Sequence, residues 1–372
     1  MRLTIVGGGG FRVPLVYGAL LERRGRLGVE ELVLHDVDES RLERIAGVLE
    51  GLAAERGERL PFRATTDLAD AVAGAAYVLC AIRVGRLEGR VVDEDVPLAL
   101  GVLGQETTGP GGICFALRTI PAMVRLAETM AAHAPRAWLI NFTNPAGMVT
   151  EAVLPLLGGR AVEVVQILVR DHPERAQPVG AEQARLVEPG KRIVVGEQAV
   201  QQLGRRGVAH AAQPAEVVEA EVVEPQIGRV AAERGGDAHD HELDANGGYE
   251  SEAMAVLEAI ALNSREVLIL NAANRSALPF LDERAVVEVP CVVGRSGAVP
   301  TAVGQVPAHA RALIETMKDV ERTTIDAALL GSRELAVKAL ALHPLVPSVS
   351  TAREIFDGYR ARLPALQEAF PA

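Results

Sequence analysis

The chain has little cysteine, no long apolar run and fewer basic than acidic residues. Its three cysteines in 372 residues lie in apolar surroundings without metal-ligand spacing, which is typical of reduced core residues in a cytoplasmic protein. No apolar run is long enough to span a bilayer, and the opening MRLTIVGGGG predicts a strand rather than a signal peptide. The net charge of -11 argues against nucleic acid or anionic membrane as a partner. A small anionic ligand in a locally basic pocket remains open.

The first half of the chain alternates between short apolar strands and amphipathic helices. The expected strands are LTIVGG (3–8), ELVLHD (31–36), AYVLCAIR (76–83), WLINFTNP (138–145) and VEVVQIL (162–168). This rhythm predicts an α/β fold with a doubly wound, parallel Rossmann-type sheet. Strands such as KRIVVG, EVLILNA and AVVEVPCVV mix with long helices farther on, which indicates an α+β domain. We therefore expect two domains, residues 1–165 and 166–372.

A glycine cluster follows the first strand. Gly7, Gly8, Gly9 and Gly10 precede a helix that we expect to begin near Pro14. Glycines here allow a tight turn and a close approach of the backbone to a pyrophosphate. Asp36 ends the second strand, where a carboxylate accepts hydrogen bonds from a ribose 2′-hydroxyl and favours NAD over NADP. The alternative is a tight strand–helix turn that binds no nucleotide.

Polar residues gather where the other strands end. Arg83 closes one strand, and Asn141, Thr143 and Asn144 close another. Gln105 and Glu106 stand in the glycine-rich segment GQETTGPGG (104–112), which is expected to be a loop. The carboxyl ends of parallel strands form the ligand crevice of such folds, so a substrate beside the nicotinamide would meet these groups. For each one the alternative is a hydrogen bond that stabilises a loop.

The segment VVQILVRDHP (164–173) poses a question of its own. It reads as a strand whose end carries Asp171 and His172. These two residues are either candidate metal ligands or the remains of a site that has lost its chemistry.

Seven segments together resemble a known family. They are GGGGFRVP, LHDVDESRL, IRVGRLEGR, GVLGQETTGPGGI, WLINFTNPAGMVTEAV, AVVEVPCVV and LALHPLVPS. On these motifs the chain resembles the family 4 glycoside hydrolases, the NAD-dependent group that includes 6-phospho-β-glucosidases. The resemblance covers nearly the whole chain except a weaker region at about 160–245.

The resemblance implies a redox-assisted elimination rather than two-carboxylate hydrolysis. In that chemistry NAD+ takes a hydride from C3 of the sugar, a Tyr removes the C2 proton, and a divalent metal, usually manganese, polarises the C3 oxygen. The hydride returns at the end. It also implies a cytoplasmic homodimer or homotetramer that binds a sugar or sugar phosphate.

Carried over position by position, the resemblance assigns NAD to the glycine cluster (Gly7, Gly8, Gly9, Gly10) and to Asp36. It places Arg83 beside both cofactor and substrate. Glu106 and Asn144 then face the sugar or its phosphate.

The metal ligands and the catalytic Tyr do not carry over. The family has a Cys-Asn pair where this chain has Leu168 and Val169, and a His in a segment whose best match here is Gln198 and Ala199. Glu250 stands at the position of the Tyr, with Tyr249 one residue earlier. Apolar side chains cannot coordinate a cation, so we expect no manganese site.

Three hypotheses follow. The first is a diverged enzyme that keeps the hydride step, with Glu250 or Tyr249 as the base, and that performs sugar oxidation, epimerisation or metal-independent elimination. The second is a non-catalytic relative that binds NAD and sugar and acts as a partner or regulator of an active paralogue.

The third hypothesis is a relocated metal site. The segment AHDHELD contains His239, Asp240, His241 and Asp244, which Asp171 and His172 would join in space. A solvated acidic loop is the simpler interpretation. His343, in LHPLVP, is expected to be structural at a helix end.

Overall fold

The computed structural model describes residues 1–164 and 249–371, which belong to one compact unit. The expected strand KRIVVG and the end of VVQILVRDHP lie outside these residues. So do Leu168, Val169, Gln198 and Ala199, and all six residues of the relocated-metal hypothesis. Their predictions therefore stay untested.

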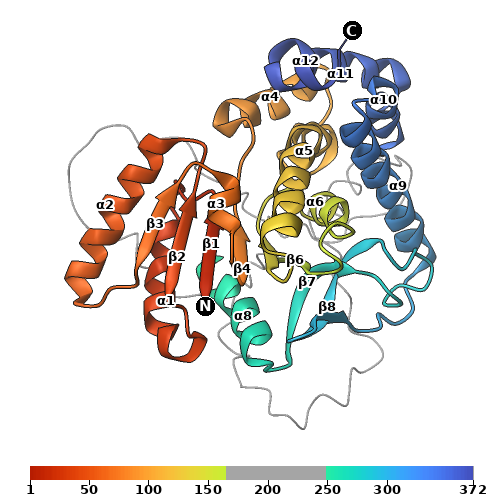
Figure 1. Ribbon diagram of the computed structural model, residues 1–372. Helices are drawn as coiled ribbons and strands as arrows, with labels where there is room; N and C mark the ends of the chain where they lie inside the picture. Colours follow the sequence, from red (N-terminus) through yellow and green to blue (C-terminus); the bar gives the residue numbers. More distant parts are fainter. Residues whose placement is uncertain (165–248, 372) are drawn as a thin grey trace, which may run out of the picture. The chain divides into compact units, whose positions relative to one another are not determined.

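One mixed sheet of nine strands organises the described residues (Figure 1), in the order β3-β2-β1-β4-β5-β6-β7-β8-β9. The neighbours from β3 to β6 are parallel, and those from β6 to β9 are antiparallel. The strands are β1 (Arg2–Val6), β2 (Glu31–His35), β3 (Phe62–Thr65), β4 (Tyr77–Cys80), β5 (Trp138–Asn141), β6 (Ala161–Val164), β7 (Glu266–Ala273), β8 (Val286–Gly294) and β9 (Gly297–Pro300).

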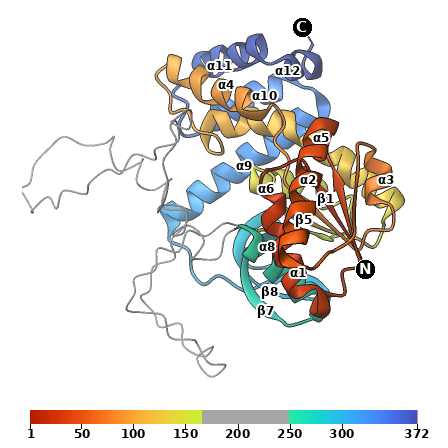
Figure 2. The ribbon, with the colours of Figure 1, turned by 90° about the vertical axis from the view of Figure 1, so that its left-hand side faces the viewer.

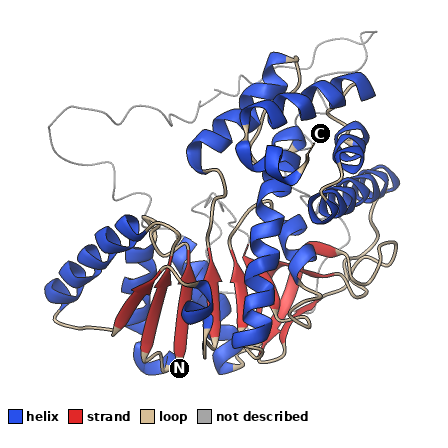
Figure 3. Cartoon of the chain, turned by 45° about the horizontal axis from the view of Figure 1, so that its top comes forward, coloured by secondary structure: helices blue, strands red, loops and turns tan. Residues whose placement is uncertain are grey.

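Helices cover both faces of the sheet (Figure 3). On one face lie α1 (Val13–Leu27), α2 (Glu39–Arg56) and α8 (Tyr249–Leu262). The other face carries α3 (Leu68–Val72), α4 (Arg86–Ala99), α5 (Gly109–His133), α6 (Ala146–Val153), α9 (Ala308–Leu330), α10 (Arg333–Leu342), α11 (Val349–Arg362) and α12 (Pro364–Ala369). In this second group, α11 packs on α4, α10 and α12 (Figure 2).

The parallel strands β1, β2 and β4 are largely apolar on both sides because both faces of the sheet are covered. Leu3 and Ile5 of β1 pack in the core with α1, α2 and α8, while Val6 packs in the opposite core. The three cysteines are buried and unpaired, as expected. Burial raises the pKa of the Cys80 thiol to about 12, so it is an inert core group rather than a nucleophile.

The fold class expected from the sequence is confirmed, with two differences in detail. The segment GQETTGPGG was expected to be a loop, but its last four residues form the first turn of α5, where Pro110 suits the helix start. The antiparallel strands β7, β8 and β9 extend the parallel sheet instead of forming a sheet of their own. The boundary at residue 165 stays a prediction. Among the described residues no helix is long and apolar enough to cross a membrane.

Candidate functional site: the carboxyl edge of β1, β2, β4 and β5

The glycine cluster forms a tight turn between β1 and α1. Gly7 has a φ of 93°, and a Cβ there would come within 2.5 Å of the Ala81 carbonyl oxygen. A Cβ on Gly9 would lie 2.7 Å from the Cβ of Arg41 and 2.9 Å from Asp36 Oδ2. Only glycine satisfies both the conformation and the close packing against β4 and α2. The loop therefore leaves backbone, not side chains, at the end of β1.

Every glycine N–H of this turn already donates a hydrogen bond. Gly7 and Gly8 donate to the His35 carbonyl at 2.9 and 2.7 Å, Gly9 donates to Asp36 Oδ2 at 3.1 Å, and Gly10 donates to Gly7 O at 2.9 Å. An anion bound at the loop would thus need further partners from the first turn of α1 or from nearby cations.

Asp36 lies directly after β2, as expected, and its carboxylate joins two loops. One oxygen accepts from Gly9, and the other accepts from the backbone N–H of Asp38 at 3.1 Å. The side chain is only partly buried, and each carboxylate oxygen can accept a second hydrogen bond. Its geometry therefore fits the ribose-binding role.

Arg83 and Glu106 come together across the end of β4. Arg83 pairs with one carboxylate oxygen of Glu106, and Arg90 of α4 pairs with the other at 3.2 Å. Arg90 also donates to Glu94 at 2.8 Å, and this hydrogen bond raises the pKa of its guanidinium. The result is a charged cluster of two arginines on one mostly buried carboxylate.

The sequence interpretation did not single out Arg90. The segment IRVGRLEGR ends at Arg90, four residues before Glu94. An arginine and a glutamate at this spacing are typical of an exposed helix face. Only the fold shows that the same arginine also reaches Glu106.

A buried ion pair fixes α4, the helix that carries Arg90. Arg118 of α5 donates to both oxygens of Asp93 of α4, each at 2.7 Å, and both side chains are 1% exposed. Burial opposes the charge on Arg118, but the two bonds to Asp93 outweigh it and raise the pKa of the guanidinium. Tyr359 of α11 donates to the Asp93 carbonyl at 3.0 Å. These contacts hold α4, and hence Arg90, in place.

At the end of β5, two polar residues are buried and bonded within the protein, and a third is exposed. Asn141 and Thr143 are buried and bonded to each other, and Thr143 Oγ1 also accepts from Ile82 N at 3.0 Å. They make loop-stabilising hydrogen bonds, which is the alternative that the sequence left open for each of them. Asn144 is exposed at the same strand end and precedes the cis peptide bond to Pro145.

Tyr249 and Glu250 form the first residues of α8. Glu250 is partly buried there, and its charge suits the start of a helix. Among the residues described, no hydrogen bond or ion pair joins Glu250 to Arg83, Glu106 or Asn144. The described part of the chain thus does not bring the candidate base into contact with the candidate sugar-binding cluster.

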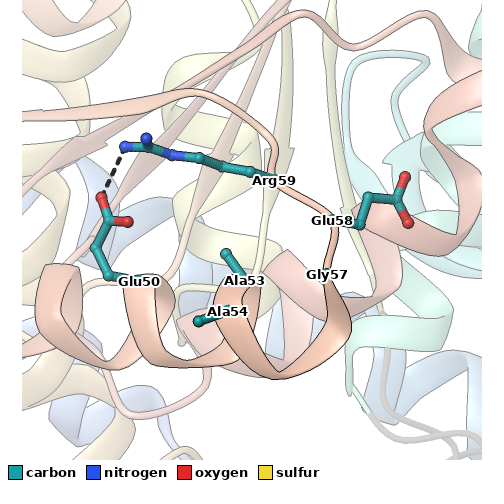
Figure 4. A pocket seen from close by; sticks show the side chains of 6 residues that line it. All are labelled: Glu50, Ala53, Ala54, Gly57, Glu58 and Arg59. Atoms are coloured by element: carbon teal, nitrogen blue, oxygen red, sulfur yellow. Dashed lines mark hydrogen bonds and ion pairs between the residues drawn. The ribbon is translucent and has the colours of Figure 1, made fainter.

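Two further features lie apart from the crevice. His343 ends α10, as expected, and burial lowers its pKa to about 4. A surface hollow at the end of α2 is lined by Glu50, Ala53, Ala54, Gly57, Glu58 and Arg59 (Figure 4). It contains none of the candidate residues. In the described ranges no group of three His, Cys, Asp or Glu side chains could hold a metal ion.

The sheet and its edge define the class of protein. A glycine turn joined to an acidic strand end, beside a cluster of arginine and glutamate, is a Rossmann-type nucleotide crevice with an adjacent polar site.

Comparison with known proteins identifies the family. Residues 2–169 match the model "Family 4 glycosyl hydrolase" and residues 197–346 match "Family 4 glycosyl hydrolase C-terminal domain". Together these matches cover more than half of the chain, which belongs to the family 4 glycosyl hydrolases.

Relatives with named activities match over nearly their full length. The chain is 28% identical to the probable 6-phospho-beta-glucosidase of Bacillus subtilis, over 98% of this chain and 97% of that protein. It is 27% identical to the maltose-6'-phosphate glucosidase of the same species, over 95% and 94%. The structure of the Thermotoga maritima 6-phospho-beta glucosidase with manganese, NAD+ and glucose-6-phosphate superposes with a TM-score of 0.74 at 21% identity, covering 97% and 98%.

Proposed function

We propose that this protein binds NAD(H) and a sugar phosphate and transfers hydride at C3 of the sugar, without the manganese site of its relatives. The observation that carries the proposal is the arrangement of residues at the carboxyl edge of β1, β2 and β4. There the glycine turn and Asp36 lie beside the cluster of Arg83, Glu106 and Arg90. The relatives' names and the ligands in the Thermotoga structure support NAD and a 6-phosphosugar as the ligand classes.

In this proposal NAD+, when bound, supplies the hydride acceptor. Asp36 accepts hydrogen bonds from the adenosine ribose, and its negative charge disfavours a 2′-phosphate. Arg83 offers a cation to the sugar phosphate or to the cofactor, and Glu106 fixes its direction. The exposed amide of Asn144 hydrogen-bonds a sugar hydroxyl. Glu250, or Tyr249, removes the proton at C2 of the oxidised sugar.

The residues present fit NAD better than they fit a metal. The turn leaves backbone at the end of β1, and a carboxylate stands at the end of β2. The family's metal positions carry Leu168 and Ala199 in the sequence and lie outside the described residues. We derive no step that uses a cation.

The test is a titration followed by an assay. We expect calorimetry to show NADH binding and weaker NADPH binding, because Asp36 would repel the extra phosphate. Equal or tighter binding of NADPH would contradict the role of Asp36. A chromogenic 6-phosphoglucoside should turn over no faster with manganese and NAD+ than without manganese. Strong manganese-dependent turnover would show that a metal site exists in this chain.

A non-catalytic role is the alternative. It is favoured by the Glu250 that stands at the position of the family's catalytic Tyr. Such a protein would bind NADH and sugar phosphate but catalyse no proton exchange. A homodimer or homotetramer, or an assembly with an active paralogue, stays a prediction.

A further inference from the structure

An ion pair lies across the carboxyl end of β1, at the opening, here called the mouth, of the glycine turn (Gly7 to Gly10). Arg86, at the start of α4, donates to Asp38 Oδ2 at 3.1 Å. Arg86 follows β4, whereas Asp38 follows β2, and β1 lies between these two strands. Neighbouring strands lie about 4.8 Å apart, so the arginine side chain extends across the end of β1, where the glycine turn begins.

The pair is connected to the turn but weakly held. Asp38 N donates to Asp36, and Asp36 accepts from Gly9, which links the pair to the glycine loop. The side chain of Arg86 is 59% exposed, so its attraction to Asp38 is screened by water. Its backbone has a φ of 54°, a conformation that non-glycine residues rarely adopt and that often marks a functional segment.

A pyrophosphate at this turn needs a positive partner. The four glycine N–H groups already donate within the protein. Asp36 and Asp38 both place negative charge at the mouth. Asp38 would not be left without a partner if Arg86 moved, because its Oδ1 accepts from Arg41 N at 3.2 Å and caps α2.

We infer that Arg86 breaks its ion pair with Asp38 when the dinucleotide binds and pairs with the pyrophosphate instead. Asp38 is then an internal competitor that holds the guanidinium at the mouth in the free protein. This inference rests on the proposed binding of NAD(H) and adds a contact to it. It makes opposite predictions for the two members of the pair.

The experiment is a calorimetric titration of NADH into the parent, Arg86→Met and Asp38→Asn. Asn caps a helix as well as Asp does, so the second variant keeps α2 intact. We expect Arg86→Met to raise the Kd about tenfold, as for loss of a charge-assisted hydrogen bond. Asp38→Asn should lower the Kd about threefold by removing the competitor. In the Arg86→Met background the gain from Asp38→Asn should shrink.

The matched control is Arg333→Met, which breaks a similarly exposed ion pair with Asp357 at 2.9 Å on α10 and α11. It should leave the Kd unchanged. Arg86→Lys should restore part of the affinity, and thermal melts should show all variants folded. The effect of Arg86→Met should decrease at high salt.

The outcomes separate the inference from the function it rests on. If the parent binds no NADH, both fail. An unchanged Kd in Arg86→Met, with NADH bound by the parent, overturns the inference alone. Weaker binding in both Arg86→Met and Asp38→Asn would mean that the intact ion pair is required, and would overturn the exchange of partners.

Discussion

Charged side chains at the carboxyl edge of the sheet hold one another in place before any ligand binds. Asp36 accepts from two loops, and Glu106 binds the guanidinium groups of Arg83 and Arg90. A group that is already oriented loses less freedom when a ligand arrives, so its contacts contribute more to binding. At the scale of single residues the crevice is preorganised on its cofactor side. In the proposed function, proton transfer depends on Glu250.

We predict that Glu250→Gln abolishes deuterium exchange at C2 of a bound sugar. The parent, with NAD+ and glucose 6-phosphate in heavy water, should incorporate deuterium as seen by NMR, because the C3 ketone acidifies the C2 hydrogen. The amide cannot accept that proton, whereas NADH binding should be unchanged.

The matched control is Glu252→Gln, which neutralises another acid in the first turn of α8. Both variants should lose about 0.3–1 kcal/mol of favourable charge at the helix start. Exchange should stop in Glu250→Gln alone. Persistent exchange in that variant would exclude Glu250 as the base, and no exchange in the parent would favour the non-catalytic alternative.

A row of polar side chains crosses four neighbouring strands beneath α6. Asn141, Glu163, Asn271 and Glu288 are paired in register from β5 to β8. Glu163 is 2% exposed and accepts from Thr150 of α6 at 2.8 Å. Burial raises the pKa of Glu163 well above its usual value. The buried carboxyl is therefore protonated in the folded protein at pH values where the unfolded chain has lost that proton.

We predict that Glu163→Gln is progressively more stable than the parent as the pH rises. A raised folded pKa gives stability that is fully present below about pH 4.5, the unfolded value, and that is lost as pH rises toward the folded pKa. Gln carries no charge at any pH and avoids this loss. In the window above pH 4.5 the difference in free energy of unfolding should grow by up to about 1.4 kcal/mol per pH unit.

Urea unfolding at pH 5 and pH 8 measures this difference. The control is Glu266→Gln at the start of β7, where the side chain is exposed and no burial effect is expected. A Glu163→Gln effect of equal size at both pH values would mean that the residue acts through packing rather than through its proton.

The sheet joins the two halves of the described chain into one structure. Strand β6 precedes residue 165 and β7 follows residue 248, yet they are hydrogen-bonded neighbours. The two buried clusters also combine residues from both halves. Trp138, the single tryptophan, begins β5, and a Cβ on Gly297 of β9 would lie 2.3 Å from its ring. Trp138 therefore reports on contacts between the halves.

We predict one unfolding transition for the described part of the chain. Trp138 fluorescence and far-UV circular dichroism should give the same midpoint in urea, because a shared sheet and core unfold together. Gly297→Ala should shift both curves equally, by about 1–3 kcal/mol, since the methyl group meets Trp138 and φ is 90°. Separate midpoints would instead indicate that residues 1–165 and residues 166–372 unfold as independent domains.

Much of the fold followed from local patterns. The apolar strand runs, the glycine turn and the helix start expected near Pro14 all placed elements close to where they lie, because period and turn chemistry depend on neighbouring residues. The expected strand 76–83 ended too late, since its last residues turn toward α4. For Asn141 and Thr143 the sequence left ligand binding and loop stabilisation both open, because a strand end in sequence does not reveal which side chains bond each other.

The sequence by itself determined the family resemblance, the parallel half of the sheet, the positions of Asp36 and Asn144 at strand ends and that of Glu106 in a glycine-rich segment. Those features are encoded in short segments and in the order of strands and helices. Tertiary structure alone decided that β7 to β9 extend the same sheet, that Arg90 binds Glu106 and that Arg86 reaches Asp38. Each of these contacts joins residues that are distant along the chain. A local sequence pattern does not show which of many such pairings buries the most apolar surface and pairs the most charges, because that choice depends on the whole fold.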